Sequence, residues 1–389
     1  MKIAILGAGV AGISSAIALK QHGFDVSVYE RHDSASNIGA GIVIWPNAAY
    51  VLEQLGVLHA MQSVSGYPTR MQRVSNTGED LGAIDIQLIN RHMGYESLSI
   101  LRRDFQTILH SKLAALGVAI HYGHAVTQIE PSHNDQAIVH FHNGLKITAD
   151  LLIGADGRMA SCARQFVHGD NAPVYQNFIN WIGVYESDVD TVHEMAVTDY
   201  WGTGARFGIV PITPRKAYWA GGLASAGIAA KISAEYKREL SMIFANWPTL
   251  VQQMIEHTPV DCINKIYVHD QNPMRAWHKN NLIVIGDAAH ASLPTSGQGA
   301  CQALEDSWHL ALCLRENSAD LAKVFTKFTE LRLEKTTGII MAGRGFAASL
   351  FNTDPLFCAQ RNETSKRTDF TAVAAAMSHG WARHLPMSA

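Results

Sequence analysis

The fold is decided at the start of the chain, in KIAILGAGVAG at residues 2–12. The apolar segment before the first glycine is typical of a buried parallel strand, and residues 10–22 have the spacing of a helix. Between them lies G-x-G-x-x-G, formed by Gly7, Gly9 and Gly12. In this setting Gly7 permits a tight turn, Gly9 lets a pyrophosphate approach the backbone, and Gly12 lets the helix pack on the strand. The stretch therefore predicts a nucleotide-binding fold.

An acidic residue completes the pattern. Residues 25–30, DVSVYE, have the pattern of a second strand that ends at Glu30, so the chain opens with a βαβ unit. A carboxylate about twenty residues after the glycines accepts hydrogen bonds from ribose hydroxyls and repels a 2′-phosphate. We therefore expect FAD or NAD rather than NADP, with Ala11 and Arg31 beside the cofactor. These residues leave the choice between FAD and NAD open.

Composition excludes several classes of protein. The 389 residues are 47% hydrophobic and 17% charged, as in an ordinary soluble globular protein. A formal net charge of -3 without a basic run argues against nucleic acid as a partner. The five cysteines form no CxxC pair, so neither a metal site nor a disulfide framework is expected.

The same features favour a cytoplasmic monomer or homodimer. The apolar N-terminus resembles a signal peptide, but its glycines have the spacing of the nucleotide fold. No uninterrupted apolar stretch reaches the roughly 18 residues that a membrane span requires.

The order of patterns along the chain predicts an α/β fold, in which a Rossmann-like domain is interrupted by a mostly antiparallel sheet. Aromatic, alternating segments such as YQNFINWIGVYE (175–186) and ARFGIVPI (205–212) are typical of antiparallel strands with one covered face. The region after residue 300 is helical in spacing. The expected division is a nucleotide-binding domain of residues 1–75, 100–170 and 270–350, a substrate domain of residues 76–99 and 171–269, and a helical C-terminal tail of residues 351–389.

A second glycine-rich loop, GDAAHASLPTSGQG at residues 286–299, follows the apolar stretch NNLIVI and precedes a helical segment. At such a strand-to-helix turn, backbone N–H groups and the positive helix end can face an anion, and phosphate is the first candidate. The residues assigned to the cofactor here are Gly286, Asp287, Gly297, Gln298, Gly299 and Ala300.

Three separated motifs together resemble the fingerprints of the class A flavoprotein monooxygenases, which have the para-hydroxybenzoate hydroxylase fold. They are GAGVAG with Glu30, LLIGADGRMASCAR at residues 151–164, and the loop at residues 286–299. Within that family, IVIWPNA (42–48) and GQGACQALED (297–306) resemble the branch of the urate and salicylate hydroxylases.

This resemblance implies that the cofactor is FAD and gives several residues a role toward it. Glu30 would hold the ribose, and Arg102 the flavin-side phosphates or the ribityl chain. Asp287 would bind the ribityl chain or the pyrophosphate. Asp156 would lie near the pyrophosphate and the path of the nicotinamide donor, or else is a turn residue at a strand end. The backbone of residues 297–299 would lie against the isoalloxazine ring.

The resemblance also implies three catalytic residues, which are Gln298 in the loop and the pair Arg206 and Tyr218. Urate hydroxylases place an arginine and a tyrosine at the positions of this pair, facing the substrate over the flavin. An arginine stabilises an anionic ring and a tyrosine hydroxyl orients a ring oxygen, whereas the alternative is a surface arginine and a packed tyrosine. Urate hydroxylases have an aspartate where this chain has Thr295, so the resemblance does not extend to urate itself.

Other residues with chemical potential are interpreted as parts of the fold. We expect His290 to be structural rather than a catalytic base. Four aromatic residues form either a substrate cage or, as aromatic side chains on strands usually do, the packing of a sheet. They are Tyr175, Trp181, Trp201 and Trp219.

The implied activity is hydroxylation of a small electron-rich aromatic or N-heterocyclic ring. NAD(P)H would reduce the FAD, and O2 would add at the flavin C4a position to give the hydroperoxide that delivers the hydroxyl group. The protein would exclude water and hold the ring in attack geometry. The alternatives are an FAD-dependent dehydrogenase or reductase of the same fold, a plain NAD-dependent dehydrogenase, and a non-catalytic flavin-binding protein.

Overall fold

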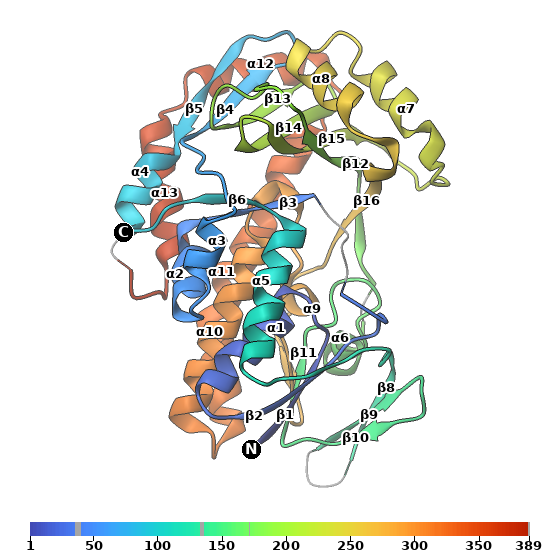
Figure 1. The fold of residues 1–389 in the computed structure, drawn as a ribbon, viewed down its shortest axis with the longest axis vertical. Coiled ribbons are helices and arrows are strands. Elements are labelled where there is room, and N and C mark those ends of the chain that lie inside the picture. The colour runs from blue at the N-terminus through green and yellow to red at the C-terminus, as the bar shows by residue number, and fades with distance from the viewer. Residues whose placement is uncertain (36–39, 133–135, 171, 388–389) are drawn as a thin grey trace.

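The computed structural model describes residues 1–35, 40–132, 136–170 and 172–387, and it confirms the expected α/β fold (Figure 1). The nucleotide-binding half is built on a six-stranded sheet that is parallel except for its antiparallel edge pair β17–β18. Across the sheet the strands are β17 (His278–Lys279), β18 (Leu282–Val284), β11 (Leu151–Gly154), β1 (Lys2–Leu6), β2 (Asp25–Tyr29) and β7 (Ile120–His121). The carboxyl ends of the four central strands therefore meet at one edge.

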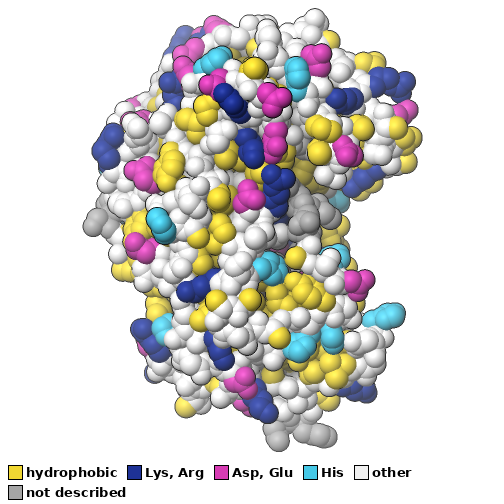
Figure 2. Space-filling model, viewed as in Figure 1, with side chains coloured by type: hydrophobic (Ala, Val, Ile, Leu, Met, Phe, Trp, Pro, Cys, Tyr) yellow, Lys and Arg dark blue, Asp and Glu magenta, His cyan; other side chains and the backbone are white. Residues whose placement is uncertain are grey.

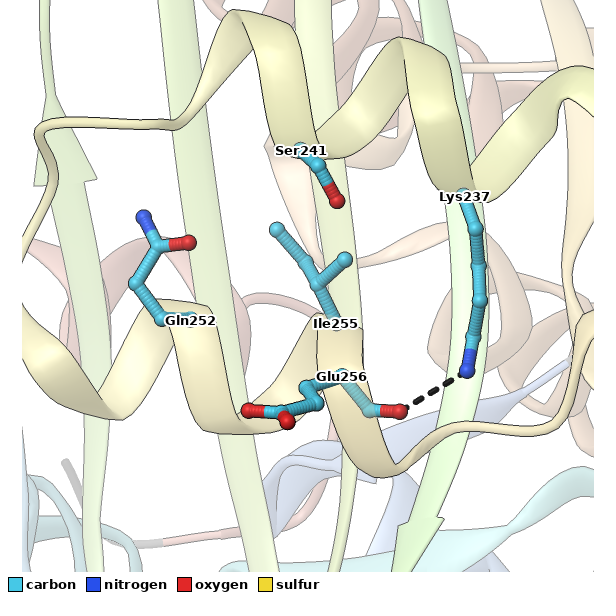
Figure 3. A pocket seen from close by; sticks show the side chains of 5 residues that line it. All are labelled: Lys237, Ser241, Gln252, Ile255 and Glu256. Carbon is cyan, nitrogen blue, oxygen red and sulfur yellow. Dashed lines mark hydrogen bonds between the residues drawn. The ribbon is translucent and has the colours of Figure 1, made fainter.

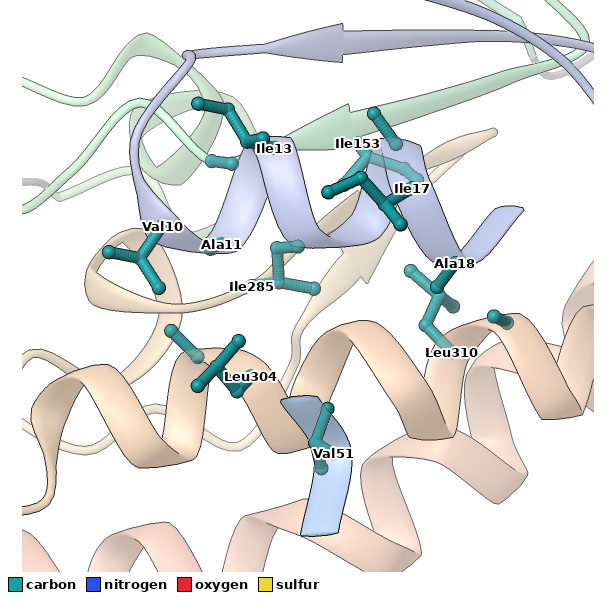
Figure 4. Close-up of a cluster of buried hydrophobic side chains, with 14 of the residues drawn as sticks. Val10, Ala11, Ile13, Ile17, Ala18, Val51, Ile153, Ile285, Leu304 and Leu310 are labelled. Atoms are coloured by element: carbon teal, nitrogen blue, oxygen red, sulfur yellow. The ribbon is translucent and has the colours of Figure 1, made fainter. Parts of the chain in front are cut away.

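Helix α1 (Val10–Gln21) packs between this sheet and helix α10 (Gly299–Asn317) (Figure 4). Every residue of α1 from Val10 to Leu19 is buried, as expected of a helix that is apolar on all sides. Ile13 and Ile17 reach the strands, and Leu304 and Leu310 approach from α10. Burying one such side chain stabilises the fold by about 1.5–3 kcal/mol, so this cluster fixes the glycine-rich turn that precedes α1.

A second, seven-stranded sheet forms the upper half of Figure 1. Its pairs are antiparallel except β13–β4, so the expectation of a mostly antiparallel sheet is confirmed. In spatial order the strands are β16 (Asn264–Asp270), β12 (Val174–Glu186), β15 (Lys216–Ala224), β14 (Ala205–Thr213), β13 (Ala196–Trp201), β4 (Arg70–Ser75) and β5 (Asp80–Asp85).

The two faces of this sheet are covered by different helices. On the outer face, Phe207 and Trp219 pack against α7 (Tyr236–Ile243) and α8 (Thr249–His257). On the inner face, Phe178 and Trp201 pack against the end of helix α11 (Leu321–Leu350) and against Leu293 of the second glycine-rich loop. The inner face is therefore the one that is turned toward the nucleotide-binding half.

Strand β4 changes the expected division of the chain. The expected nucleotide-binding segment 1–75 includes this strand, but the strand pairs with β13 and β5 inside the large sheet. The reason is that its partner β13 lies more than a hundred residues later, which no local pattern reveals. We therefore propose the same two domains with the first boundary moved to before Arg70.

Shorter elements complete the fold. Helices α2 and α3 are separated at Gly56, which has a positive φ of 68°. The bounds are β3 (Gly41–Ile44), α2 (Pro46–Gln54), α3 (Leu58–Gln62), α4 (Ile86–Met93), β6 (Leu98–Leu101), α5 (Arg102–Ala115), β8 (Val126–Pro131), β9 (Ala137–Phe141), β10 (Lys146–Ile147), α6 (Cys162–His168) and α9 (Asp287–His290), with short 3-10 turns at Ser233–Glu235, Val260–Cys262 and Pro294–Ser296.

The C-terminal segment is helical, as expected. After α11, α12 (Pro355–Lys366) and α13 (Phe370–Ala382) return along the side of the molecule, in red in Figure 1. Within the described residues, none of the helices has the length and apolar content to cross a membrane.

Candidate cofactor and substrate site

The three sequence motifs meet at the carboxyl edge of the parallel sheet. A β-carbon at Gly7, where φ is +109°, would lie 2.3 Å from the carbonyl oxygen of Ala155, and one at Gly12 would lie 1.9 Å from that of Gly7. A β-carbon at Gly286 would lie 2.7 Å from the Ala11 methyl group. None of these three positions has room for a side chain. The three motifs can therefore pack this closely only because glycine stands at each position.

Gly9 differs from its neighbours, because a β-carbon there would meet no atom of the described residues within 4 Å. Gly9 is the N-cap of α1, and no side chain of the described residues caps the helix end. Among these residues the first N–H groups of α1 are open, which is the arrangement that receives a phosphate. These residues fit the pyrophosphate of a dinucleotide.

Glu30 lies beside that turn. Its Oε2 accepts a hydrogen bond from the Ala8 N–H at 2.8 Å, and its Oε1 accepts one from the His32 N–H at 3.0 Å. The carboxylate is therefore held at the end of β2, next to the glycine turn, where a ribose would lie. Arg31, the next residue, is exposed.

Two arginines face one carboxylate across the edge. Arg158 Nη1 lies 3.1 Å from Asp287 Oδ2, and Arg102 at the start of α5 is close enough to both to feel their charges. Burial lowers the pKa of Arg102, although Asp287 opposes that shift. With the described residues the Arg102 guanidinium makes no hydrogen bond or ion pair, and Arg158 Nε is likewise buried without a partner. The cluster has one positive charge in excess, which fits an anionic group.

The Asp156 carboxylate accepts hydrogen bonds from the residues that follow it in its own turn. Its Oδ1 accepts from the Ser161 hydroxyl at 2.5 Å and its Oδ2 from the Ala163 N–H at 3.1 Å. Burial raises the pKa of this carboxyl group, while these donors lower it. The side chain therefore has the role of a turn residue, and it is the Asp156 backbone that lies against Gly7.

The loop at residues 286–299 is tied down at its far end. Trp45 Nε1 donates to the Gly297 carbonyl at 3.0 Å, and Gly297 has a positive φ of 62°. Gln298 is 1% exposed, and its Oε1 accepts from Asn47 Nδ2 at 3.0 Å and Gln302 Nε2 at 2.9 Å. Because its side chain points into this buried network, Gln298 is better described as a support of the loop than as a catalytic group. Its Nε2 has no partner among the described residues.

The loop begins in a second buried network. Asp306 of α10 accepts from the Gly286 N–H at 2.7 Å and contacts His290 Nε2 at 2.6 Å. Arg332 of α11 donates to Asp306 at 2.7 Å and also pairs with Glu305. The cations and hydrogen bonds hold the pKa of Asp306 far below its usual range despite burial. His290 thus pairs with a buried carboxylate of α10.

Arg206 and Tyr218 lie on the inner face of the large sheet. The outward Phe207 and Trp219 alternate with them along β14 and β15. Tyr218 covers Gly41 of β3, where a β-carbon would lie 2.1 Å from its ring, and it is near Cys301 of α10. Burial raises the pKa of the Tyr218 hydroxyl far above its usual range.

The aromatic residues divide between the faces. Trp181 and Trp219 are in the cluster under α7 and α8, and Tyr175 packs at its edge, so these three are sheet packing rather than a substrate cage. Trp201 is on the inner face, where its Nε1 donates to Asp199 at 2.8 Å.

Several functional contacts were not predicted. Arg344 of α11 forms a two-pronged ion pair with Asp270 of β16, and Arg164 donates to the carbonyls of Ala288 and Ala289 in α9. The adjacent acids at 305–306 inside an apolar helix were a readable signal of a buried ion pair. The pairing partners of the arginines were not readable, because they lie on distant elements.

A hollow elsewhere has no part in this site. It lies between α7 and α8 and is lined by Lys237, Ser241, Gln252, Ile255 and Glu256 (Figure 3). Lys237 Nζ crosses it to the Glu256 carbonyl at 2.8 Å, and no aromatic side chain lines it. Figure 2 shows an indentation at the side of the molecule, between the half with the large sheet and the half with the parallel sheet.

Comparison with known proteins agrees with this geometry. The model of the FAD binding domain family matches residues 1–324. An aurachin C monooxygenase/isomerase of Stigmatella aurantiaca is 29% identical over 341 residues, which are 87% of this chain and 87% of that protein. A FAD-dependent urate hydroxylase of Mycolicibacterium vanbaalenii is 29% identical over 350 residues, 88% of this chain and 87% of that protein.

A solved structure extends the likeness to the whole fold. Klebsiella pneumoniae HpxO, in a crystal structure with FAD and uric acid, matches with a TM-score of 0.90 and 26% identity over 98% of this chain and 97% of that chain. Because the family model spans most of the residues and the cradle at the sheet edge fits a dinucleotide, the chain belongs to the FAD binding domain family of flavoproteins, as its resemblance to the class A monooxygenases predicted.

Proposed function

We propose that this protein is a FAD-dependent monooxygenase that uses NAD(P)H and O2 to hydroxylate a small aromatic or N-heterocyclic ring. The observation that carries the proposal is the meeting of two surfaces. A dinucleotide cradle at the sheet edge faces the inner side of a second sheet, from which Arg206 and Tyr218 project. Relatives named as monooxygenases or hydroxylases of ring compounds support it.

Bound FAD supplies a two-electron carrier that can pass electrons to O2, which does not react readily with organic rings by itself. The residues of this chain bind and orient. The open N-terminus of α1 at Gly9 and the spare cation Arg102 would hold the phosphates, and Glu30 the ribose. The main chain of residues 297–299 would support the ring system.

The substrate would lie between that loop and the large sheet. Tyr218, whose raised pKa keeps its hydroxyl protonated, would donate to or accept from a ring oxygen. Arg206 would stabilise negative charge that develops on the ring. The inner-face cluster of Phe178, Leu293 and Phe351 would exclude water from this end of the cavity.

Thr295 bears on the choice of substrate. Its hydroxyl donates to the Gly343 carbonyl of α11 at 3.0 Å, so it is committed to the fold and supplies no carboxylate. A substrate that depends on a loop carboxylate for activation is therefore disfavoured, and we expect urate to be poorer than a ring that already carries an activating hydroxyl group.

A panel of hydroxylated aromatic acids, hydroxypyridines and purines tests the proposal. Purified protein should be yellow, and one class of ring should accelerate NADH or NADPH oxidation and gain one oxygen atom by mass spectrometry. Oxidation of the donor without an oxygenated product would favour a dehydrogenase or reductase of the same fold. Protein that takes up no FAD on reconstitution would remove the proposal altogether.

A further inference from the structure

Helix α13 runs from the large sheet to the glycine-rich loop. At its first residue, the Phe370 ring fills the space over Gly82 of β5, where a β-carbon would lie 2.2 Å away. Near its last residue, the Trp381 ring packs against Trp45 with centroids 4.8 Å apart. Figure 1 shows this helix in red beside α4 and α11. One element thus contacts the edge of the large sheet at one end and, at the other, the tryptophan that holds the glycine-rich loop.

The contact at Trp381 continues into the loop. Trp45 is 3% exposed, and its indole N–H holds the Gly297 carbonyl at 3.0 Å. Gly297 begins the segment 297–299, which we call the platform. Trp381 is therefore separated from the platform by a single side chain.

A second connection runs through buried charges. Lys335 Nζ donates to the carbonyls of Trp381 at 2.6 Å and Arg383 at 3.1 Å, and to both oxygens of Glu305 at 3.0 and 2.9 Å. Glu305 in turn accepts from Asn47 at 2.7 Å. The same Asn47 amide nitrogen reaches Oε1 of Gln298, the middle residue of the platform.

These groups have few alternative arrangements. Glu305 is 0% exposed and Lys335 is 6% exposed, so neither can exchange its partner for water. In such surroundings a hydrogen bond is strong and an unpaired charge costs several kcal/mol. A shift at the end of α13 must therefore displace Lys335 or Trp45, and through them the platform.

We propose that the end of helix α13, through Trp381, is a positioning element for the platform that supports the flavin. This gives a role to the C-terminal tail, which lies outside the 324 residues that the family model matches. The inference rests on the proposed function only in that the platform contacts bound FAD.

FAD binding by the full-length protein tests this without any turnover. Trp381→Ala removes the ring that supports Trp45, and we expect the Kd for FAD, measured by flavin fluorescence titration, to rise about 3- to 10-fold because binding must then order the platform. The visible absorption band of the bound flavin should shift as well. Trp381→Phe keeps an aromatic ring against Trp45 and should restore both values to near wild type.

The matched control is Phe370→Ala. It removes a packed aromatic ring from the other end of the same helix, so it should lower the melting temperature and leave the FAD affinity and spectrum unchanged. Equal changes in FAD affinity in Trp381→Ala and Phe370→Ala, or no change in either, would overturn the inference. Wild-type protein that binds no FAD would instead refute the proposed function itself.

A milder variant covers the case in which Trp381→Ala fails to fold. Trp381→Leu keeps most of the buried volume and removes the flat ring, and Trp45→Phe keeps an aromatic ring but removes the N–H group that donates to Gly297. If Trp381 acts through Trp45, the two substitutions should not act independently. The fold-increase in the Kd for FAD in Trp381→Leu/Trp45→Phe should then be smaller than the product of the fold-increases in the two single variants. Multiplicative effects would show independent action and would contradict the proposal.

Discussion

Asp199 Oδ1 accepts two hydrogen bonds from Arg206, from Nε at 2.9 Å and from Nη2 at 2.6 Å. The other oxygen of the carboxylate accepts from Trp201 Nε1 at 2.8 Å. The side chains of Arg206 and Asp199 are 16% and 11% exposed, so the pair is largely desolvated. The carboxylate thus offsets part of the positive charge of Arg206 before a substrate arrives, and it fixes the guanidinium plane.

Asp199→Asn should change the preference of the enzyme for charge. Without the carboxylate, the positive charge of Arg206 is uncompensated, and a ring with a carboxylate substituent gains attraction relative to a neutral ring. We expect the ratio of kcat/KM for the charged over the neutral analogue to rise about 3- to 30-fold. The affinity for FAD should stay unchanged, and an unchanged ratio would show that Arg206 does not face the substrate.

A pair of glycine variants separates cofactor binding from folding. At Gly9, where φ is −78°, an alanine is conformationally ordinary and its β-carbon meets no atom of the described residues, so Gly9→Ala should leave the apoprotein as stable as wild type. It should weaken FAD at least about tenfold, because the methyl group occupies the place of the pyrophosphate. Isothermal titration and apoprotein melting measure the two effects.

Gly12→Ala is the counterpart of that variant. Its methyl group would collide with the Gly7 carbonyl 1.9 Å away, so the apoprotein itself should lose about 1–3 kcal/mol. If Gly9→Ala destabilises the apoprotein as much as Gly12→Ala does, the conclusion that the space beside Gly9 is open is wrong.

The sequence predicts the local elements around these glycines but not the contacts that bring the motifs together. The strand, the turn and the helix of residues 2–21 follow from local spacing, and so does the strand that ends before Glu30. The resemblance of three motifs then indicated a shared site before any of their contacts was known. What brings the motifs together is the parallel pairing of β1, β11 and β18, in which each strand is nearly 130 residues or more from the next in the sequence.

Side-chain partners on other elements are what the sequence does not reveal. Asp199 pairs with Arg206 across a hairpin, on the neighbouring strand. The glycine turn predicts the place of Gln298, whereas the direction of its side chain depends on Asn47 in α2. A local pattern indicates which backbone a residue occupies, and long-range packing decides where its side chain points.

His309 should make the protein sensitive to mild acid. It is 3% exposed in α10, and burial, with Arg332 nearby, lowers its pKa to about 3. At a pH between the ordinary histidine pKa near 6.5 and this lowered value, His309 is protonated in the unfolded chain but not in the folded chain. The free energy of unfolding therefore falls as the pH decreases from about 6.5 toward 3. The loss is at most about 1.4 kcal/mol per pH unit.

The variant His309→Phe removes this titration. Urea unfolding at pH 7 and pH 5 should show a smaller loss of stability in the variant than in the wild type. The acids of the same network act at lower pH, because the lowered pKa values of Glu305 and Asp306 keep their contribution until the pH falls below about 4. An identical loss between pH 7 and pH 5 in both proteins would assign the acid sensitivity to other groups.

Arg344→Met should loosen the joint between the large sheet and helix α11. Asp270 is 0% exposed and accepts from Arg344 Nε at 2.6 Å, from Nη2 at 2.8 Å and from Gln176 at 2.8 Å. Removing the arginine leaves a buried carboxylate with a single donor, and we expect a loss of about 3–5 kcal/mol in urea unfolding.

The adjacent residue of α11 gives this joint a functional consequence. Gly343 accepts the Thr295 hydroxyl at 3.0 Å, so Arg344 fixes α11 at the point where it holds the loop against the inner face of the sheet. In Arg344→Met, KM for the ring substrate should therefore rise more than the Kd for FAD, since Arg344 joins α11 to the large sheet and not to the phosphate cradle. The double variant Asp270→Leu/Arg344→Met removes the stranded charge and should recover stability without recovering KM. Recovery of both would mean that the ion pair stabilises the fold and has no part in shaping the substrate cavity.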